Sequence, residues 1–262
     1  MKVLLLADIH SNIYALNAVE AAEAPFDMVL CVGDIVDWGM DPVEAIQWLE
    51  KYNYVAVSGN HDDFVVSADK NEKRIRMGLE PEAGTYQIDY DPIGQEKNFM
   101  TYTLNLLSER ELGMLQRLPS SAVVEIDGFT YYLKHTSEEE KGDIVLKAMK
   151  EFRSQVLFDR LWEETGRQDV PMEKRRIVFA HSHQCWMHLV RGGALFMNPG
   201  SISNRTLGSD NIEPGADYIV IQDGVPQMKH VSYPTEELRK RIAEAPFEER
   251  IKEMALQLHT PE

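Results

Sequence analysis

The residues most able to do chemistry in this chain fall into five short segments that mix carboxylate, amide and imidazole side chains. The segments are Asp8-Ile9-His10, Gly33-Asp34-Ile35-Val36-Asp37, Gly59-Asn60-His61-Asp62, Lys134-His135 and Ala180-His181-Ser182-His183. They hold five of the eight histidines. Each segment alone is more typical of a turn or a helix cap, but all five in this order indicate a metal site. Imidazole and carboxylate ligands favour Mn, Fe, Zn or Ni over a soft-metal thiolate site.

Each of the five segments follows a short apolar run that predicts a buried β-strand. The expected strands are Lys2–Ala7, Met28–Val32, Tyr54–Val57, Phe129–Leu133 and Ile177–Ala180. Two expected helices separate the first three strands. Apolar residues recur at helical spacing over Asn12–Ala24, and Pro42 opens a second helix that runs to about Lys51. This βαβαβ order predicts a largely parallel sheet, in which ligands bind outside the carboxyl ends of the strands. The topology therefore brings the segments to one rim.

The rest of the chain predicts an insertion, further helices and three hairpins. Residues 66–97 are polar and interrupted by proline and glycine, so we expect an inserted loop or cap there. Helices are expected over Asn98–Gln116 and within Asp143–Trp162. Asp-Gly and Gly-Gly turns predict hairpins that pair Ala122–Ile126 with Phe129–Leu133, Trp186–Val190 with Ala194–Met197, and Tyr218–Gln222 with Gln227–Val231.

One α/β domain with two sheets and a small cap accounts for this pattern. We expect the domain at residues 1–231, with 66–97 as the insertion, and a charged C-terminal helical tail at residues 232–262, interrupted at Pro246. The tail is a candidate element for a homodimer. The alternative is a helical pair packed on the sheet of its own chain.

Composition disfavours several classes of function. The chain has 262 residues and a net charge of −16, which argues against broad binding to nucleic-acid backbones and against docking on anionic membranes. No apolar run reaches the roughly 18 residues of a membrane-spanning helix, and the apolar start breaks at Asp8, too early for a signal peptide. Cys31 and Cys185 cannot form a disulfide framework. We interpret both as small core residues of a protein in the reducing cytoplasm.

The ordered segments resemble the motifs of the calcineurin-like metallophosphoesterase family. Those motifs run Asp-x-His, Gly-Asp-x-x-Asp, Gly-Asn-His-Asp/Glu, a lone His and Gly-His-x-His, and the resemblance covers residues 1–231. The runs Gly33–Pro42 and Asn198-Pro199-Gly200-Ser201 look most like the compact bacterial and archaeal phosphodiesterase-like branch. The resemblance implies a two-sheet β-sandwich flanked by helices, with a site for two divalent metal ions.

The resemblance also implies the metal ligands. The first metal would be bound by Asp8, His10, Asp34 and His183, and the second by Asp34, Asn60, His135 and His181, with Asp34 bridging the two. Mn is the favoured ion, and Fe, Zn, Ni or Mg are alternatives. Two such ions clamp the attacking and leaving oxygens of an in-line displacement and lower the pKa of a bridging water, which supplies hydroxide.

The resemblance implies roles beside the metals for five further residues. His61 would protonate the leaving oxygen, and Asp37 would orient and charge the His61 ring. The alternative for Asp37 is a solvated loop acid. Asp62 is an alternative partner for His61, although we favour a helix cap. Asn198 or Arg205 would contact a phosphate oxygen, and the alternative is a structural turn with a surface arginine.

Some positions depart from the family pattern. Ala180 replaces the usual glycine, a mild change if the backbone is extended there. Thr136-Ser137 follows His135 where relatives often have glycine, and the acidic run Glu138-Glu139-Glu140 comes next. These acids disfavour highly anionic substrates unless their loop points away from the site. Trp38 and Asp62 replace the arginine and glutamate of protein phosphatases, which puts that activity in doubt.

Three hypotheses for function follow. The leading one is a dinuclear metal-dependent phosphoesterase that hydrolyses a small phosphomonoester or phosphodiester by metal-bridged hydroxide attack. The second is a protein phosphatase or a dinucleoside-polyphosphate phosphatase, which shares the metals but differs in its pocket. The third is a non-catalytic scaffold of the same fold, against which His61 beside a full ligand set counts. The leading hypothesis predicts a small phosphorylated substrate as the partner, with no membrane and no nucleic acid.

Overall fold

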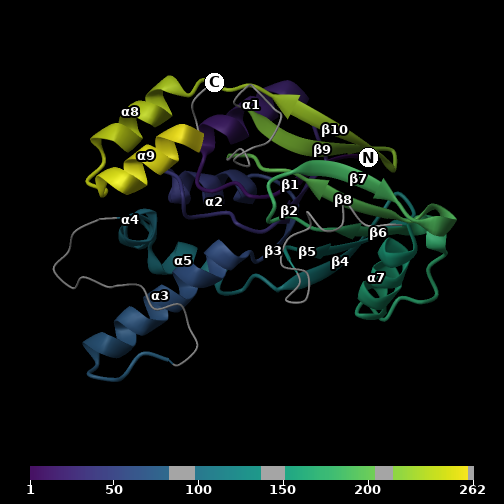
Figure 1. Cartoon of the computed structure of the whole chain (residues 1–262), viewed down its shortest axis with the longest axis horizontal. Coiled ribbons are helices and arrows are strands. Elements are labelled where there is room, and N and C mark those ends of the chain that lie inside the picture. Colours follow the sequence, from purple (N-terminus) through teal and green to yellow (C-terminus); the bar gives the residue numbers. More distant parts are fainter. Residues whose placement is uncertain (83–97, 137–150, 204–214, 259–262) are drawn as a thin grey trace.

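The computed structural model describes residues 1–82, 98–136, 151–203 and 215–258. Two five-stranded sheets pack face to face, and helices cover both outer faces of the sandwich (Figure 1). The two-sheet α/β sandwich expected from the sequence is confirmed. Within those described ranges, none of the helices combines the length and the apolar character needed to cross a membrane.

The first sheet begins with the three strands nearest the N-terminus. β1 (Lys2–Leu6), β2 (Met28–Val32) and β3 (Tyr54–Val57) run parallel. A hairpin of β9 (Ala216–Gln222) and β10 (Val225–Val231) joins the other side of β1, with β9 antiparallel to it. The order is therefore β10-β9-β1-β2-β3. The sheet is mixed rather than largely parallel, because a late hairpin returns to the first strand.

The second sheet consists of two hairpins and one further strand. Its order is β4-β5-β6-β8-β7, in which β5, β6 and β8 are parallel and both edge strands are antiparallel to their neighbours. Its strands are β4 (Ser121–Ile126), β5 (Phe129–Lys134), β6 (Arg175–Val178), β7 (Cys185–Leu189) and β8 (Leu195–Pro199). All three predicted hairpins are confirmed, and the strand ends fall within two residues of the predicted ones.

Side chains that alternate along the strands divide the interior into layers. Val3 and Leu5 of β1 lie in the core between the two sheets, whereas Leu4 and Leu6 lie in the core between the first sheet and its helices. This period of two is that of a strand buried on both faces. Across the sandwich, Tyr132 of β5 packs in a third cluster under α7.

The helices cover the two outer faces unequally (Figure 1). The second sheet is covered by α7 (Glu151–Glu163), the described part of the helix expected within Asp143–Trp162. The first sheet is covered by α1 (Ile13–Glu23), α2 (Pro42–Glu50), α3 (Asn60–Arg76), α4 (Phe99–Leu106), α5 (Glu109–Leu115), α8 (Glu236–Glu244) and α9 (Glu249–Leu258).

Two expectations for the middle of the chain are corrected. Residues 66–76 belong to α3 rather than to a loop, because Val65, Val66 and Ala68 are buried in the helical layer and hold that segment as a helix. Residues 83–97 of the expected cap lie outside the described residues. The helix expected over Asn98–Gln116 is divided into α4 and α5, because Ser108 and Glu111 form a capping box that starts a second helix.

The C-terminal tail forms the expected helical pair and packs on its own chain. Leu238 and Ile242 of α8 and Ala255 of α9 are buried in the same core as α1 and α2. The two helices separate at Ala245, directly before the predicted interruption at Pro246. Much of the apolar surface of the tail is therefore used within the chain.

Candidate metal centre

The five candidate segments lie just beyond the carboxyl ends of five strands. These are β1, β2 and β3 of the first sheet and β5 and β6 of the second. Backbone hydrogen bonds tie neighbouring segments together, since Asp8 N donates to Gly33 O and Ala180 N donates to His135 O, each at 3.0 Å. The backbone N–H of His181 after β6 donates to Asp8 Oδ2 after β1 at 3.1 Å, so both sheets bring their polar strand ends to one rim, as the topology predicts.

The backbone at this rim is held in an unfavourable conformation. φ is positive for five of the candidate ligands, at Asp8 (51°), His10 (46°), Asp34 (54°), His181 (70°) and His183 (60°). Left-handed backbone costs a residue with a Cβ about 1–2 kcal/mol and persists only where the surroundings impose it, most often at functional sites. Its concentration at these residues favours a functional role for the rim. Ala180 lies outside this region, so its methyl group in place of glycine causes no backbone strain.

Two motif glycines let the segments approach one another. At Gly33, where φ is +84°, a Cβ would lie 2.6 Å from Gly59 N and 2.8 Å from His135 Nδ1. At Gly59, a Cβ would collide with the carboxylate of Asp34. Both positions require glycine because neighbouring candidate ligands occupy the space of a side chain.

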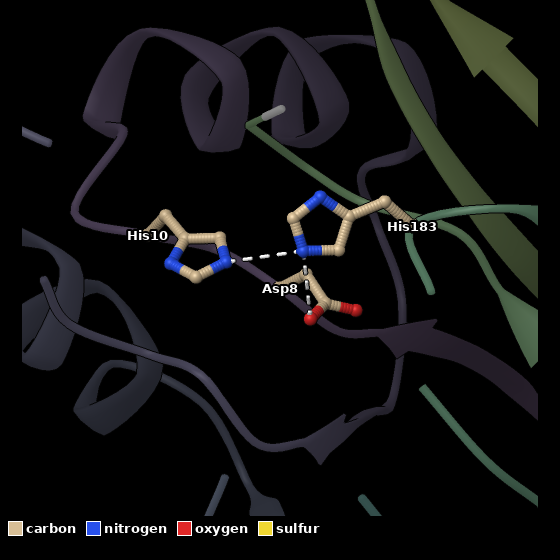
Figure 2. Close-up of side chains that lie close together, drawn as sticks. All are labelled: Asp8, His10 and His183. Carbon is tan, nitrogen blue, oxygen red and sulfur yellow. Dashed lines mark hydrogen bonds and ion pairs between the residues drawn. The ribbon is translucent and has the colours of Figure 1, made fainter. Parts of the chain in front are cut away.

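The first group of candidate ligands is Asp8, His10 and His183 (Figure 2). The ring nitrogens of the two histidines face each other beside the carboxylate, with 3.3 Å between His10 Nε2 and His183 Nε2. His183 Nε2 lies 3.3 Å from Asp8 Oδ1. All three donor atoms fall within 4.8 Å of one another, a spacing that suits a shared cation.

The second group is Asp34, His135 and His181, with Asn60 among them. Asn60 Oδ1 lies 2.8 Å from His181 Nδ1 and 3.2 Å from His135 Nε2. The Nδ1–H of His135 donates to the carbonyl of Val32 at 2.7 Å, so Nε2 is the nitrogen that faces the group. Metal-binding histidines are commonly oriented by such a bond from the opposite ring nitrogen.

Asp34 lies between the two groups. Its Oδ2 is 3.2 Å from His135 Nε2 in the second group and 3.8 Å from His10 Nε2 in the first. Its Oδ1 accepts a hydrogen bond from the backbone N–H of His61 at 2.8 Å, which fixes the carboxylate. One carboxylate thus contacts both sets of ligands.

The electrostatics of the rim suit a bound cation. Asp8 Oδ1 is buried, and its described contact is with the ring of His183, itself a candidate ligand. Burial lowers the pKa of His10 to about 3, which leaves its ring neutral with a free lone pair. Burial alone would raise the pKa of Asp34, but the charge and hydrogen bond of His135 outweigh it and lower the pKa, so Asp34 stays ionised. Burial disfavours the charged ring of His135, but the charge and hydrogen bond of Asp34 outweigh it and raise the pKa of His135 to about 10. Divalent ions bind ionised carboxylates and neutral imidazoles, so these residues fit two such ions if binding displaces the proton of His135.

His61 stands beside the two groups and is paired with Asp37. Its Nδ1 lies 2.8 Å from Asp37 Oδ2, so Nε2 is the ring nitrogen that this bond does not use. Burial disfavours the charged ring, but the hydrogen bond to Asp37 and the charge of Asp34 outweigh it and raise the pKa of His61. The predicted His61–Asp37 pair is thus present in the structure.

A sequence profile of the calcineurin-like phosphoesterase superfamily domain matches residues 1–213. The chain belongs to the calcineurin-like phosphoesterase superfamily. This family binds divalent metal ions, and the two His/Asp groups of this chain could hold such ions.

Relatives of known structure share the fold over almost the whole chain. A metallophosphoesterase from Sphaerobacter thermophilus has 18% identity and a TM-score of 0.66, covering 98% of this chain and 99% of its own. A hypothetical protein from Pyrococcus horikoshii has 16% identity and a TM-score of 0.70, covering 97% of each chain. An uncharacterised protein from Methanocaldococcus jannaschii is 39% identical over 62 residues, which span 23% of this chain and 26% of that protein.

Asp62 of the family motif is a cap rather than a partner of His61. Its Oδ1 accepts from the backbone N–H groups of Ile35 at 2.9 Å and Val36 at 3.1 Å, and its Oδ2 accepts from Gly59 N at 3.0 Å. These bonds join the loop after β2 to the start of α3, so Asp62 positions the segments that carry Asp34 and Asn60.

Of the two alternatives for Asn198, its surroundings favour the structural turn. Its side chain is fully buried, donates to Ala180 O at 3.0 Å and accepts from Gly200 N at 2.9 Å. Because these bonds use its amide within the fold, Asn198 shapes the turn behind the histidine segment. Arg205 and the acidic run at residues 138–140 lie outside the described residues.

A cavity of about 700 Å³ opens beside the second group, at Asn60 and His135. Its wall mixes hydroxyl groups and charges of both signs. The polar residues include Ser58, Ser120, Thr136, Lys134, Arg160 and Glu164. Lys134 forms an ion pair with Glu164 at 2.8 Å. No sequence motif marks this wall, although Lys134 immediately precedes the candidate ligand His135.

Proposed function

We propose that this chain is a dinuclear metal-dependent phosphoesterase that hydrolyses a small phosphomonoester or phosphodiester. The position of Asp34 carries the proposal. Its Oδ2 lies within 4 Å of ring nitrogens from both His/Asp groups, the arrangement expected of a bridging carboxylate. Membership of the family supports the same chemistry.

The ligands follow from the two groups. Asp8, His10 and His183 would hold one ion, while Asn60, His135 and His181 would hold the other, with Asp34 shared. When bound, two divalent ions offset the charge of the phosphoryl oxygens and make a water molecule nucleophilic at neutral pH. The buried carboxylates and the oriented ring of His135 keep the ligand geometry fixed before substrate arrives.

His61 is the proton donor in this proposal. The hydrogen bond from Nδ1 to Asp37 favours the protonated ring and fixes its orientation, which leaves Nε2–H for the leaving oxygen. As the P–O bond breaks, the proton on Nε2 passes to that oxygen and an alcohol leaves. A group of this kind contributes about 10²–10⁴ in rate.

The cavity beside Asn60 and His135 is the place we propose for the part of the substrate beyond the phosphoryl group. Hydroxyl groups and charges of both signs line it, which suits a polar group better than an aliphatic one. The net charge of −16 favours a small substrate over a polyanion.

Hydrolysis of model esters tests the proposal. We expect the metal-loaded protein to cleave bis-nitrophenyl phosphate or nitrophenyl phosphate with Mn²⁺ added, and to lose the activity on chelation. Asp34→Asn should abolish it, whereas Asp169→Asn, at an exposed carboxylate, is the matched control. Turnover that survives both chelation and Asp34→Asn would contradict the proposal.

A further inference from the structure

The C-terminal helices lie beyond the residues that the family profile matches, yet they hold a loop of the candidate site. The profile ends at residue 213, and α8 and α9 follow it. In Figure 1 this pair lies beside α1 and α2, on the helical side of the first sheet. Arg241 of α8 donates from Nη1 to Asp41 Oδ1 at 2.5 Å and from Nη2 to Met40 O at 3.2 Å. One guanidinium thus binds both the backbone and a side chain of the loop between β2 and α2.

That loop carries the partner of His61. Asp37 and Trp38 both have left-handed backbone, with φ of 69° and 59°. The Trp38 ring meets the His61 ring edge-on, at 6.1 Å between centroids and an interplanar angle of 83°. Such a backbone conformation persists only when contacts around it impose it. The ties at Met40 and Asp41 are among those contacts, two to four residues away.

A second line of contacts runs from the tail to the same loop. Phe247, between α8 and α9, packs on Phe99 at 4.5 Å between ring centroids. Phe99 in turn stacks on Trp38 at 6.1 Å and 17°. Tyr102, which also contacts Phe247, donates its hydroxyl to Met40 O at 3.2 Å. The tail therefore reaches His61 through an aromatic chain as well as through Arg241.

The charge balance makes Arg241 important to the loop. Asp41 is 5% exposed, and its Oδ2 accepts no hydrogen bond. Among the residues that the structure describes, the cation paired with Asp41 is Arg241. A buried carboxylate without its cation is strongly disfavoured, so loss of Arg241 would drive Asp41, and the loop with it, toward water.

We propose that Arg241 is a positioning residue for proton donation, and that the α8–α9 tail holds residues 37–41 so that Asp37 and Trp38 fix the His61 ring. The inference rests on the proposed function, in which His61 protonates the leaving oxygen. It adds a role for a segment outside the matched family domain. The tail becomes part of the catalytic unit through the loop it holds.

Hydrogen exchange tests the structural half without any activity. Arg241→Gln should speed amide exchange in peptides that cover residues 36–42, where Asp41 N is bonded to Ser11 O at 2.9 Å, and leave β1 to β3 unchanged. Lys240→Gln, at the exposed neighbouring position on α8, is the control of equal charge. If Arg241→Gln does not fold, the double variant Asp41→Asn/Arg241→Gln removes the buried charge as well. Unchanged exchange in this loop would overturn the inference.

Leaving-group dependence tests the catalytic half. Arg241→Gln should lower kcat about 10- to 100-fold on an alkyl phosphate and much less on a nitrophenyl ester, with its metals retained. Its effect on the alkyl substrate should disappear in a His61→Ala background, because both changes remove the same step. Both rates are taken per folded protein, so a loss of folded protein does not change the comparison.

The outcomes separate this inference from the proposed function. Equal losses on both substrates, or an effect that persists without His61, would overturn the positioning role and leave the phosphoesterase proposal intact. A wild-type protein that cleaves no ester would contradict the proposed function and the catalytic half together. The exchange experiment would still decide whether Arg241 holds the loop.

Discussion

Replacing His61 with alanine separates proton donation from metal binding. The backbone N–H of His61 donates to Asp34 Oδ1 at 2.8 Å, and alanine keeps that bond. The ring itself belongs to neither His/Asp group. His61→Ala should therefore retain its metals, and its effect should depend only on how much the leaving group needs a proton.

The expected magnitude follows from the role. A general acid contributes about 10²–10⁴, which corresponds to about 2.7–5.4 kcal/mol of transition-state stabilisation. An alkyl phosphate, whose alkoxide leaves poorly, should lose this full amount in kcat/KM. A nitrophenyl phosphate, whose phenolate leaves unaided, should lose less than about tenfold. The side chain is only 20% exposed and its ring packs against Trp38 and Phe64, so the rates are taken per folded protein.

The assay compares kcat/KM on both esters for wild type, His61→Ala and His230→Ala, with metal content measured on each preparation. His230 lies on β10, outside both groups, and serves as the control. Equal losses on the two esters with metals retained would refute proton donation and assign His61 to substrate positioning. A lost metal would make His61 a ligand and overturn the place given to Asn60.

Three more outcomes are expected. Asp34→Asn should lose at least one bound metal, because an amide lacks the charge that Oδ2 brings to both groups; elemental analysis checks this, and full metal content would remove the bridging assignment. Ser120→Trp, on the cavity wall, should raise KM for bulky esters and leave KM for small esters unchanged. Val156→Trp, on the exposed side of α7, is the control and should change neither KM value. Identical substrate profiles for the two variants would exclude the cavity as the subsite. Burial raises the pKa of Cys185 to about 12, so iodoacetamide at pH 7.5 should leave activity unchanged and react faster only as the pH rises toward that value; rapid inactivation at pH 7.5 would contradict the core assignment.

The candidate site was largely predictable because its determinants are local. Each polar segment directly follows an apolar run. Neighbouring parallel strands have their carboxyl ends at the same edge of the sheet, whatever structure the rest of the chain adopts. The three parallel strands of the first sheet therefore place Asp8, Asp34 and Asn60 at one rim. The motif glycines at positions 33 and 59 act locally as well, since they admit the close approach of the segments.

Features that depend on distant packing could not be predicted in the same way. The polar composition of residues 66–76 suggested a loop, but burial of one side of α3 holds that segment as a helix. Asn198 stood beside the histidine motif and suggested a substrate contact, yet the fold turns its amide inward. Arg241 is one of several charges in the tail, and its link to Asp41 spans 200 residues of sequence. No local spacing marks such a pair.

Metal titration into the metal-free protein tests the central claim most directly. Calorimetry with Mn²⁺, read beside phosphoester turnover at each addition, should show two equivalents bound per chain, with activity complete only after the second. Two sites are expected because two groups of ligands share Asp34. Full turnover with one bound ion, or no binding by the folded chain, would contradict the dinuclear account.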